Sequence, residues 1–373
     1  MSARALPLVA VVSGATCPSA ARLREPELLR RVRVVRVEHE DAAALERQAP
    51  LLREAEALLW IPAIGAPSAP AHAVLSRLWP LLPAVRHVHS FTAGVDGIGP
   101  FVHGCLAPCT NRVTLTNARG AYTSSLAEYA LLGMLYFNKQ VLRLQHNRVA
   151  RQWDNFKMAT MSSKQIGLLG YGSIGQATGA AAKAAFPGCR VVALRRQAAG
   201  SGAGSAGAGS GMDTGTGTGT GTSTKTGTGP ADEVLCSGDA AQRMRFFRES
   251  DFIVSSLPLT DATRGLVGRA ELATMKRSAV LVSLGRGAVI DEQALGEALR
   301  EGRLRGAVLD VFEKEPLPHD SPLWDLDNVL ITAHNADNTD DIFDLGWKVW
   351  LSNLDCFLER RPFLTPVDLA QGY

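Results

Sequence analysis

The stretch Gln165-Ile-Gly-Leu-Leu-Gly-Tyr-Gly-Ser-Ile-Gly175 lies near the middle of a 373-residue chain and decides how the rest is interpreted. Its last six residues fit the pattern GxGxxG, which is weak evidence alone. Here the pattern follows an apolar strand-like run and precedes an alanine-rich helical segment, so its spacing has a physical meaning. The first glycine permits a tight turn, the second lets the backbone approach a pyrophosphate, and the third lets helix and strand pack closely. The predicted cofactor-binding residues of this strand, turn and helix are Gly170, Tyr171, Gly172, Ser173, Ile174 and Gly175.

The end of the next strand-like run indicates which dinucleotide fits. An NAD site usually has an acidic residue about 20 residues beyond the fingerprint, where it binds the ribose 2′-hydroxyl. This chain has Arg195 and Arg196 there, and the next acid is Asp213. Guanidinium groups bind a 2′-phosphate strongly and gain little from a hydroxyl. We therefore expect NADP(H) as the preferred cofactor, with NAD(H) as the alternative.

Strand-like runs alternate with helix-like segments along most of the chain. The runs are 6–14, 31–39, 57–63 and 85–91 in a first series, and 165–170, 190–196, 251–258, 279–286, 306–312 and 328–334 in a second. Strands separated by helices predict parallel sheets that are covered on both faces. The fold class is therefore α/β, with two doubly wound parallel-sheet domains, the second of Rossmann type.

Three segments connect or interrupt these series. Ser125 and Glu128 have capping-box spacing and open a long apolar-periodic segment through Leu144, which predicts one connecting helix. A second helix is expected over residues 340–361. A Gly/Ser/Thr tract, residues 198–229, has almost nothing apolar, so it is expected to be a disordered loop that a short turn can replace with little loss of kcat. The expected domains are 1–118, 119–332 and a returning C-terminal segment, 333–373.

Composition excludes several classes of protein. The net charge is +3 and the basic residues are scattered, so we expect no nucleic-acid partner. No run of 18 apolar residues occurs, which argues against a membrane span, and the N-terminal apolar run ends as a buried strand does. Cys105 and Cys109 are the only close pair among six dispersed cysteines, and they lack the partners of a zinc site. We expect reduced thiols, no metal and a cytoplasmic location.

Longer motifs occur in a fixed order along the chain. They are Ala93-Gly-Val-Asp96, Asn117-Ala-Arg-Gly120, Ala127-Glu-Tyr129, Ser283-Leu-Gly-Arg-Gly-Ala-Val-Ile-Asp-Glu292, Leu309-Asp-Val-Phe-Glu-Lys-Glu-Pro-Leu-Pro318, Ser321-Pro-Leu-Trp324, Asn328-Val-Leu-Ile-Thr-Ala-His334, Pro366-Val-Asp368 and Gly372-Tyr373. Together they resemble the D-isomer-specific 2-hydroxyacid dehydrogenases over nearly the whole chain. The resemblance implies a flavodoxin-like substrate domain followed by a Rossmann NAD(P)-binding domain, with catalysis in a cleft between them.

The resemblance also implies a catalytic trio, Arg286, Glu315 and His334. Arg286 offers a permanent planar cation for a carboxylate and a carbonyl, and its flanking glycines suggest close backbone approach to a ligand. His334 can give or take a proton near neutral pH. A neighbouring glutamate favours the imidazolium; Glu313 is two residues from Glu315, and the family pattern selects Glu315.

Further roles follow from the same resemblance. The backbone N–H groups of Ala93, Gly94 and Val95 would bind the substrate carboxylate. Trp153 would either border the substrate pocket or have a packing role at the interface. Additional cofactor-binding residues would be Leu257, Pro258 and Asp310, of which Asp310 would hold the nicotinamide carboxamide. The resemblance further implies a homodimer.

Two departures from the family pattern concern the catalytic loops. Ala333 stands where the family usually has proline, and Ser283 where it usually has asparagine. The sequence as a whole predicts an enzyme, an oxidoreductase that transfers a hydride from NADPH to a small 2-oxoacid such as glyoxylate or hydroxypyruvate, giving the D-2-hydroxyacid reversibly. The alternative is a dinucleotide-sensing corepressor-like protein, because fold alone does not establish activity.

Overall fold

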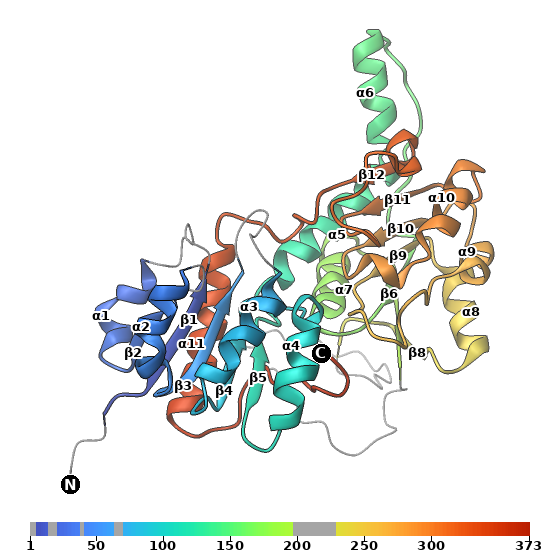
Figure 1. Ribbon diagram of the computed structural model, residues 1–373. Coiled ribbons are helices and arrows are strands. Elements are labelled where there is room, and N and C mark those ends of the chain that lie inside the picture. Colours follow the sequence, from blue (N-terminus) through green and yellow to red (C-terminus); the bar gives the residue numbers. More distant parts are fainter. Residues whose placement is uncertain (1–4, 14–20, 38–40, 63–69, 197–228) are drawn as a thin grey trace, which may run out of the picture. The chain divides into compact units, whose positions relative to one another are not determined.

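The computed structural model describes residues 5–13, 21–37, 41–62, 70–196 and 229–373, and the chain divides into two compact units (Figure 1). Unit 1 comprises residues 1–122 and 340–373, and unit 2 comprises residues 123–339. The boundaries expected from the sequence, after residues 118 and 332, lie a few residues earlier. The tract for which disorder was expected lies, apart from its last residue, outside the described residues.

Unit 1 is built on a five-stranded parallel sheet of order β2-β1-β3-β4-β5. Its strands are β1 (Leu8–Ser13), β2 (Arg33–Arg36), β3 (Ala55–Ile61), β4 (His87–Ser90) and β5 (Thr114–Asn117). This is the flavodoxin-like order, so that expectation is confirmed. The sequence did not predict β5, because three of its four residues are polar.

Both faces of this sheet are buried, as the alternation of side chains along β1 shows. Leu8, Ala10 and Val12 belong to a core that includes helices α2 and α3, whereas Val9 and Val11 pack in the core of α11. The helices of unit 1 are α1 (Pro26–Leu29), α2 (Ala42–Leu52), α3 (Ala71–Leu78), α4 (Gly99–Phe101) and α11 (Ile342–Leu358). Short 3-10 or π turns cover Arg22–Arg24, Trp79–Leu81, Asp96–Ile98, Val102–Leu106 and Ala107–Cys109.

Unit 2 is built on a seven-stranded parallel sheet of order β12-β11-β10-β9-β6-β7-β8. Its strands are β6 (Gln165–Leu169), β7 (Arg190–Arg195), β8 (Glu233–Cys236), β9 (Phe252–Ser255), β10 (Val280–Ser283), β11 (Gly306–Leu309) and β12 (Val329–Ile331). Numbered from β6, the order is that of a Rossmann sheet with one extra strand, which confirms the predicted fold class. The order reverses between β6 and β9, where such folds bind ligands.

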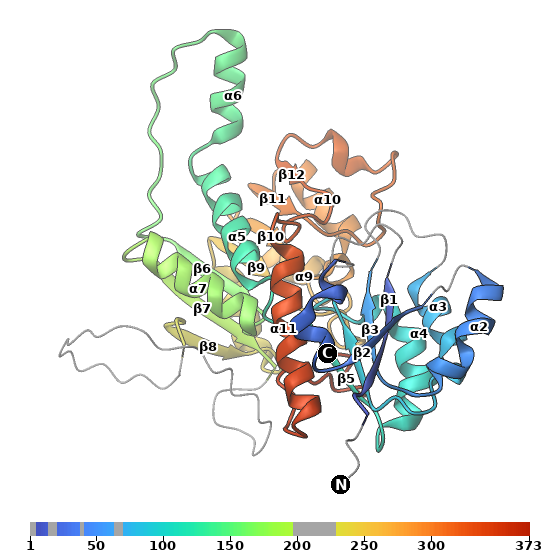
Figure 2. The ribbon, with the colours of Figure 1, turned by 90° about the vertical axis from the view of Figure 1, so that its left-hand side faces the viewer.

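The helices of unit 2 are α5 (Thr123–Asn138), α6 (Val141–Ala150), α7 (Ser173–Ala185), α8 (Ala240–Glu249), α9 (Arg269–Thr274) and α10 (Glu292–Arg300), with 3-10 turns at Gly287–Val289 and Pro322–Asp325. The prediction of one connecting helix through Leu144 was wrong. Gln140 has a left-handed φ of 54°, which ends α5 and starts α6 in a new direction. In Figures 1 and 2, α6 projects from unit 2 as an arm.

Strands β7 and β8 are parallel neighbours, and this changes the view of the Gly/Ser/Thr tract. Arg195 pairs with Cys236 at one end, while the N–H of Asp232 donates to the carbonyl of Val191 at the other. The chain therefore leaves at the carboxyl end of β7 and returns at the amino end of β8. Parallel strands need a crossover connection, and Ala231 and Asp232, which lie beyond the tract, already form part of the return to β8. The expectation that a short turn can replace residues 198–229 with little loss of kcat stays a prediction.

Two further expectations concern the environment of the chain. The N-terminal apolar run forms β1, whose six residues are all buried. Among the described residues, no helix has the length and apolarity that a membrane crossing requires. The five cysteines in the same ranges, which include Cys105 and Cys109, are free thiols.

Candidate active site

The glycine fingerprint adopts the geometry that its sequence predicts. Gly170 follows β6 with φ of 98°, a conformation that favours glycine. A Cβ on Gly175 would lie 2.2 Å from the carbonyl oxygen of Gly170, so helix and turn could not pack with any larger residue there. A Cβ on Gly172 would meet no atom within 4 Å, which leaves its backbone open on that side. Helix α7 begins at Ser173, and its N-terminus therefore points at the same open edge.

The other fingerprint residues and the arginine pair lie around this turn. Ser173 and Ile174 form the first turn of α7, and the hydroxyl of Tyr171 accepts a hydrogen bond from the N–H of Ala231 at 2.9 Å. Arg195 ends β7, and Arg196 follows it; both are exposed. The two guanidinium groups thus come from the strand beside β6, at its carboxyl end.

Leu257 and Pro258 follow β9 on the other side of the fingerprint. A Cβ on Gly170 would lie 3.1 Å from the side chain of Leu257, so Leu257 borders the turn. The carbonyl of Pro258 accepts a hydrogen bond from the hydroxyl of Thr263 at 2.7 Å, which fixes the loop beyond the strand.

The structure gives its own reason for the glycines on either side of Arg286. A Cβ on Gly285 would lie 2.4 Å from the carbonyl oxygen of Leu257, and one on Gly287 would lie 1.9 Å from the carbonyl carbon of Phe312. The close approach of protein backbone therefore accounts for both glycines, and the interpretation that they let a ligand approach stays a prediction. Arg286 itself is half-buried at the end of β10, and its Nη1 donates to the carbonyl of Gly285 at 2.8 Å.

His334 and Glu315 form a direct pair. The Nδ1 of His334 lies 2.7 Å from Oε2 of Glu315, and Oε1 of Glu315 accepts the N–H of Phe312 at 3.0 Å. The backbone N–H of Glu313 donates to the carboxylate of Glu292 at 3.0 Å. The geometry therefore selects Glu315 as the partner of His334.

The contact between His334 and Glu315 shifts the pKa of each residue in the direction that favours its charged form. The hydrogen bond to Glu315 raises the pKa of His334 above its usual range, against the opposing effect of burial. Burial favours the neutral acid of Glu315, but the hydrogen bonds from His334 and Phe312 lower its pKa below the usual range. Arg286 lies close enough to lower both pKa values by its charge. The pair therefore favours the imidazolium form of His334 and the carboxylate form of Glu315.

Asp310 is fully buried after β11 and fastens the loop that carries His334. Its Oδ1 accepts hydrogen bonds from the hydroxyl of Thr332 at 2.6 Å, from the N–H of Asn335 at 3.0 Å and from the N–H of Ala336 at 3.2 Å. The sequence-based role for Asp310, holding a carboxamide, stays a prediction. The loop-fastening role gave no sequence signal, because it depends on backbone groups more than 20 residues away.

Asp337 was also absent from the sequence-based candidates. Burial raises its pKa, while the positive charges of His334 and Arg286 oppose that rise. Because the charges of His334 and Arg286 act on it, Asp337 lies near the trio and is a further acid of the site. An acidic residue in a polar loop carries no signal that separates it from surface residues, so sequence reasoning had no means to find it.

In unit 1 the predicted substrate-binding residues Ala93, Gly94 and Val95 form a hydrogen-bonded loop after β4. The hydroxyl of Thr92 donates to the carbonyl of Gly94 at 2.7 Å, and the amide of Asn117 donates to the carbonyl of Ala93 at 2.6 Å. The carbonyls of the loop are thereby held in fixed directions. The loop lies at the carboxyl edge of its sheet, as expected for a ligand-binding loop in an open α/β fold.

Trp153 lies on the extended segment that follows α6. It is 97% exposed in this chain, and both of its expected roles, bordering the substrate pocket and packing at an interface, stay predictions. Val149, near the end of the same helix, is 76% exposed. The arm thus presents large apolar side chains to solvent.

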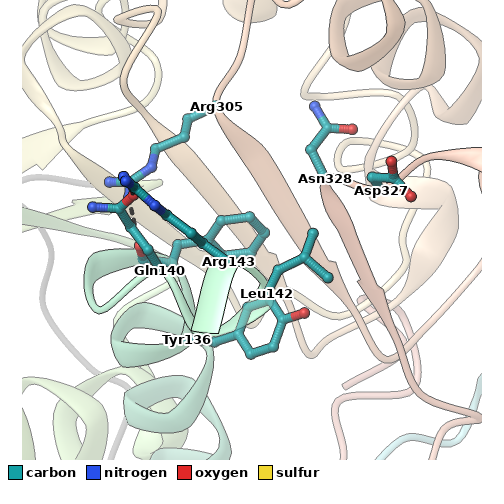
Figure 3. Close-up of a pocket in the computed structure, with 8 residues that line it drawn as sticks. Tyr136, Gln140, Leu142, Arg143, Arg305, Asp327 and Asn328 are labelled. Carbon is teal, nitrogen blue, oxygen red and sulfur yellow. Dashed lines mark hydrogen bonds between the residues drawn. The ribbon is translucent and has the colours of Figure 1, made fainter. Parts of the chain in front are cut away.

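A cavity of about 240 Å³ lies at the opposite edge of the seven-stranded sheet (Figure 3). Arg305 and Asn328, which line it, immediately precede β11 and β12, whereas Asp310 and Thr332 follow those strands. Its other lining residues are Tyr136, Phe137, Gln140, Leu142, Arg143 and Asp327. The length of the strands therefore separates the cavity from the trio.

Comparisons with known proteins agree with this arrangement. A sequence profile of the D-isomer specific 2-hydroxyacid dehydrogenase NAD binding domain matches residues 224–336. The chain is 60% identical to a glyoxylate/hydroxypyruvate reductase B from Pectobacterium carotovorum over 86 residues, which are 23% of this chain and 27% of that protein. It is 31% identical to a glyoxylate reductase from Aeropyrum pernix over 268 residues, 69% of this chain and 68% of that protein. The first curated relatives are matched over less than half of their own length.

Solved structures extend the similarity to the whole fold. An NADPH-dependent glyoxylate/hydroxypyruvate reductase from Sinorhizobium meliloti, solved in complex with NADP and sulfate, has 24% identity and a TM-score of 0.72, covering 98% of this chain and 100% of that chain. This supports the fold of both units. With the extended match to the Aeropyrum protein and the profile over the second sheet, the chain belongs to the D-isomer specific 2-hydroxyacid dehydrogenase family.

Proposed function

We propose that this protein reduces a small 2-oxoacid to the D-2-hydroxyacid with NADPH. The observation that carries the proposal is the Glu315–His334 pair beside Arg286, at the carboxyl edge of the sheet that also holds the dinucleotide fingerprint. Reduction of a 2-oxoacid needs a cation for the anionic substrate and a proton for the oxygen that becomes an alkoxide. This cluster has both.

The three side chains have separate tasks. The guanidinium of Arg286 binds the substrate carboxylate and polarises the carbonyl. Because Nδ1 of His334 is bonded to Glu315, the other ring nitrogen, Nε2, donates its proton to the carbonyl oxygen. Glu315 keeps the imidazole protonated and oriented. In the oxidation direction, the neutral His334 accepts the proton back.

The fingerprint and the arginine pair fit NADPH, which supplies the hydride when bound. The backbone at Gly172 is open and the N-terminus of α7 faces the same edge, a combination that binds pyrophosphate. Arg195 and Arg196 are exposed at the end of the neighbouring strand, where a 2′-phosphate is bound in such folds. The NADP in the Sinorhizobium structure supports this choice.

Glyoxylate and hydroxypyruvate are the substrates we propose, because the Pectobacterium and Aeropyrum relatives carry those names. We propose that the N–H groups of Ala93, Gly94 and Val95 bind the substrate carboxylate from unit 1, held by Thr92 and Asn117. Trp153 remains proposed as a residue that borders the substrate.

We also propose a cytoplasmic homodimer. The free cysteines fit a reducing compartment, and the exposed Val149 and Trp153 on the arm give a second copy an apolar surface to bind. Light scattering should give twice the chain mass, and Val149→Glu should give monomers. A monomeric wild-type protein at micromolar concentration would contradict the dimer.

A panel of 2-oxoacids with NADPH and NADH tests the activity. We expect turnover of glyoxylate or hydroxypyruvate, and His334→Ala should lower the reductive kcat by at least about 100-fold, the usual scale of acid–base catalysis. Near-normal turnover of that variant would remove His334 from the mechanism. A higher kcat/KM with NADH would overturn the cofactor choice. Cofactor binding without turnover of any substrate would favour the corepressor-like alternative.

A further inference from the structure

We propose that Tyr129, acting through Thr332, is a positioning residue that holds the His334 loop in its working conformation. The inference rests on the proposed function, in which His334 donates the proton. Tyr129 and Thr332 are 203 residues apart in the chain, yet their hydroxyl groups are hydrogen-bonded to each other. Neither residue has a role in the trio or in the predicted cofactor site.

The direction of the hydrogen bonds follows from the number of protons available. The hydroxyl of Thr332 donates its single proton to Oδ1 of Asp310 at 2.6 Å. In its contact with Tyr129, the Thr332 hydroxyl must therefore accept the hydrogen bond, and the phenol of Tyr129 must donate it. Burial raises the pKa of Tyr129 to about 12, so the phenol keeps this proton throughout the working pH range. The chain of donors thus runs from Tyr129 through Thr332 to the buried carboxylate of Asp310.

The loop needs such anchoring because its backbone is strained. His334 has φ of 52°, in the left-handed region that residues other than glycine rarely adopt. Ala333 precedes it and, unlike proline, does not restrict its own φ. The loop is held instead by Asp310, whose carbonyl accepts the N–H of His334 at 2.8 Å and whose carboxylate binds residues on both sides of it.

Helix α5 brings Tyr129 to this loop and keeps it there. Gly133, one turn later on the same face, packs so closely on β11 that a Cβ would lie 3.0 Å from the side chain of Val308. Farther along, Phe137 packs over Gly306, where a Cβ would lie 2.2 Å from its ring. These contacts fix the helix against β11, the strand that Asp310 follows. Tyr129 therefore connects a rigid element to the strained loop.

Removal of either hydroxyl should loosen the loop and lower kcat without weakening substrate binding. We expect Tyr129→Phe to lower the reductive kcat about fivefold and Thr332→Val about 30-fold, the effect of one neutral and one charge-assisted hydrogen bond. KM for the oxoacid should stay within about twofold. The double variant should resemble Thr332→Val alone, because the two hydroxyls act in one chain. Thr332→Ser keeps the hydroxyl and should restore most of kcat.

A readout independent of turnover is the NMR titration of the His334 imidazole. A looser loop weakens the contact with Glu315, so the pKa of His334 should fall in Tyr129→Phe and Thr332→Val, and the alkaline limb of the reductive rate should move to lower pH. Tyr136→Phe, on the same helix, is the matched control and should change neither. Wild-type kcat and titration in both variants would overturn the proposal, as would fully additive effects. Full turnover of His334→Ala would instead contradict the proposed function, while the titration would still test the network.

Discussion

Histidines in the two units show opposite responses to their surroundings. In unit 1, His87 and His89 lie on β4 and bond to one hydroxyl, that of Thr116, at 2.8 and 2.7 Å. Burial lowers the pKa of His87 to about 3 and lowers that of His89 well below its usual range. In unit 2, the bond to Glu315 raises the pKa of His334.

The difference teaches that the partner, and not burial alone, decides whether a histidine is charged. His87 and His89 have a neutral hydroxyl as partner, and His87 also stacks on Phe363 with ring centroids 4.4 Å apart, so they are neutral members of a core. His334 has a carboxylate as partner and is partly exposed, so its protonated form is favoured and the ring can exchange a proton with a ligand.

Removing the negative charge of Glu315 should have the largest effect on the contrast between His334 and the histidines of unit 1. In Glu315→Gln, the amide oxygen can still accept a hydrogen bond from His334, but the negative charge that stabilises the imidazolium is removed, so the imidazolium loses its proton at a lower pH. Since reduction requires the protonated form, activity falls as pH rises through this pKa, and the alkaline limb should move to lower pH. We expect a loss of about 100-fold in kcat at pH 8. A pH profile identical to that of the wild type would contradict the role of Glu315.

An intermediate effect is expected on the stability of unit 1 in acid. Unfolded His87 takes up a proton near pH 6.5 and folded His87 only near pH 3, so its contribution is intact above about pH 6.5 and is lost as pH falls towards 3. His87→Phe can keep the stacking and removes this loss. Between pH 7 and 5, the variant should lose about 2 kcal/mol less of its free energy of unfolding than the wild type.

Urea unfolding followed by tryptophan fluorescence measures this difference. His103→Gln is the control, because His103 is exposed, and it should lose as much stability as the wild type. Equal losses for His87→Phe and the wild type would show that His87 is protonated in the folded state, and the contrast with His334 would disappear.

The smallest effect sharpens the assignment of the carboxylate. Glu313→Gln changes an acid only two residues from Glu315, but His334 is bonded to Glu315. We expect kcat within about twofold of the wild type and an unchanged alkaline limb. A loss comparable to that of Glu315→Gln would mean that the loop exchanges its two glutamates.

The sequence predicted the parts of the structure that local patterns encode. Apolar runs gave most strands of both sheets, and GxGxxG after β6 gave the position and the conformation of the turn at Gly170. The trio came from motif resemblance, and the structure joins Glu315 to His334 by a hydrogen bond. The helix break at Gln140 was not predicted, because an isolated left-handed residue leaves no periodic signal.

Features that depend on contacts between distant segments escaped sequence reasoning. The flanks of Arg286 are glycine because Leu257 and Phe312 approach them, which no pattern around residue 286 reveals. The bond from Tyr129 to Thr332 likewise joins two positions that only the folded sheet brings together. Strand β5 was missed because three of its four residues are polar, and β8 because it begins with a glutamate and has only two aliphatic residues.

The parallel pairing of β7 and β8 has a consequence for protein engineering. Strand β8 begins opposite Val192, three residues before the end of β7, so the connection between the two strands runs back by roughly 10 Å at about 3.3 Å per residue. Ala231 and Asp232 already lie on this return path, because their N–H groups donate to the hydroxyl of Tyr171 and to the carbonyl of Val191. Variants that keep these residues and shorten the tract stepwise would therefore measure how few residues suffice to close the connection.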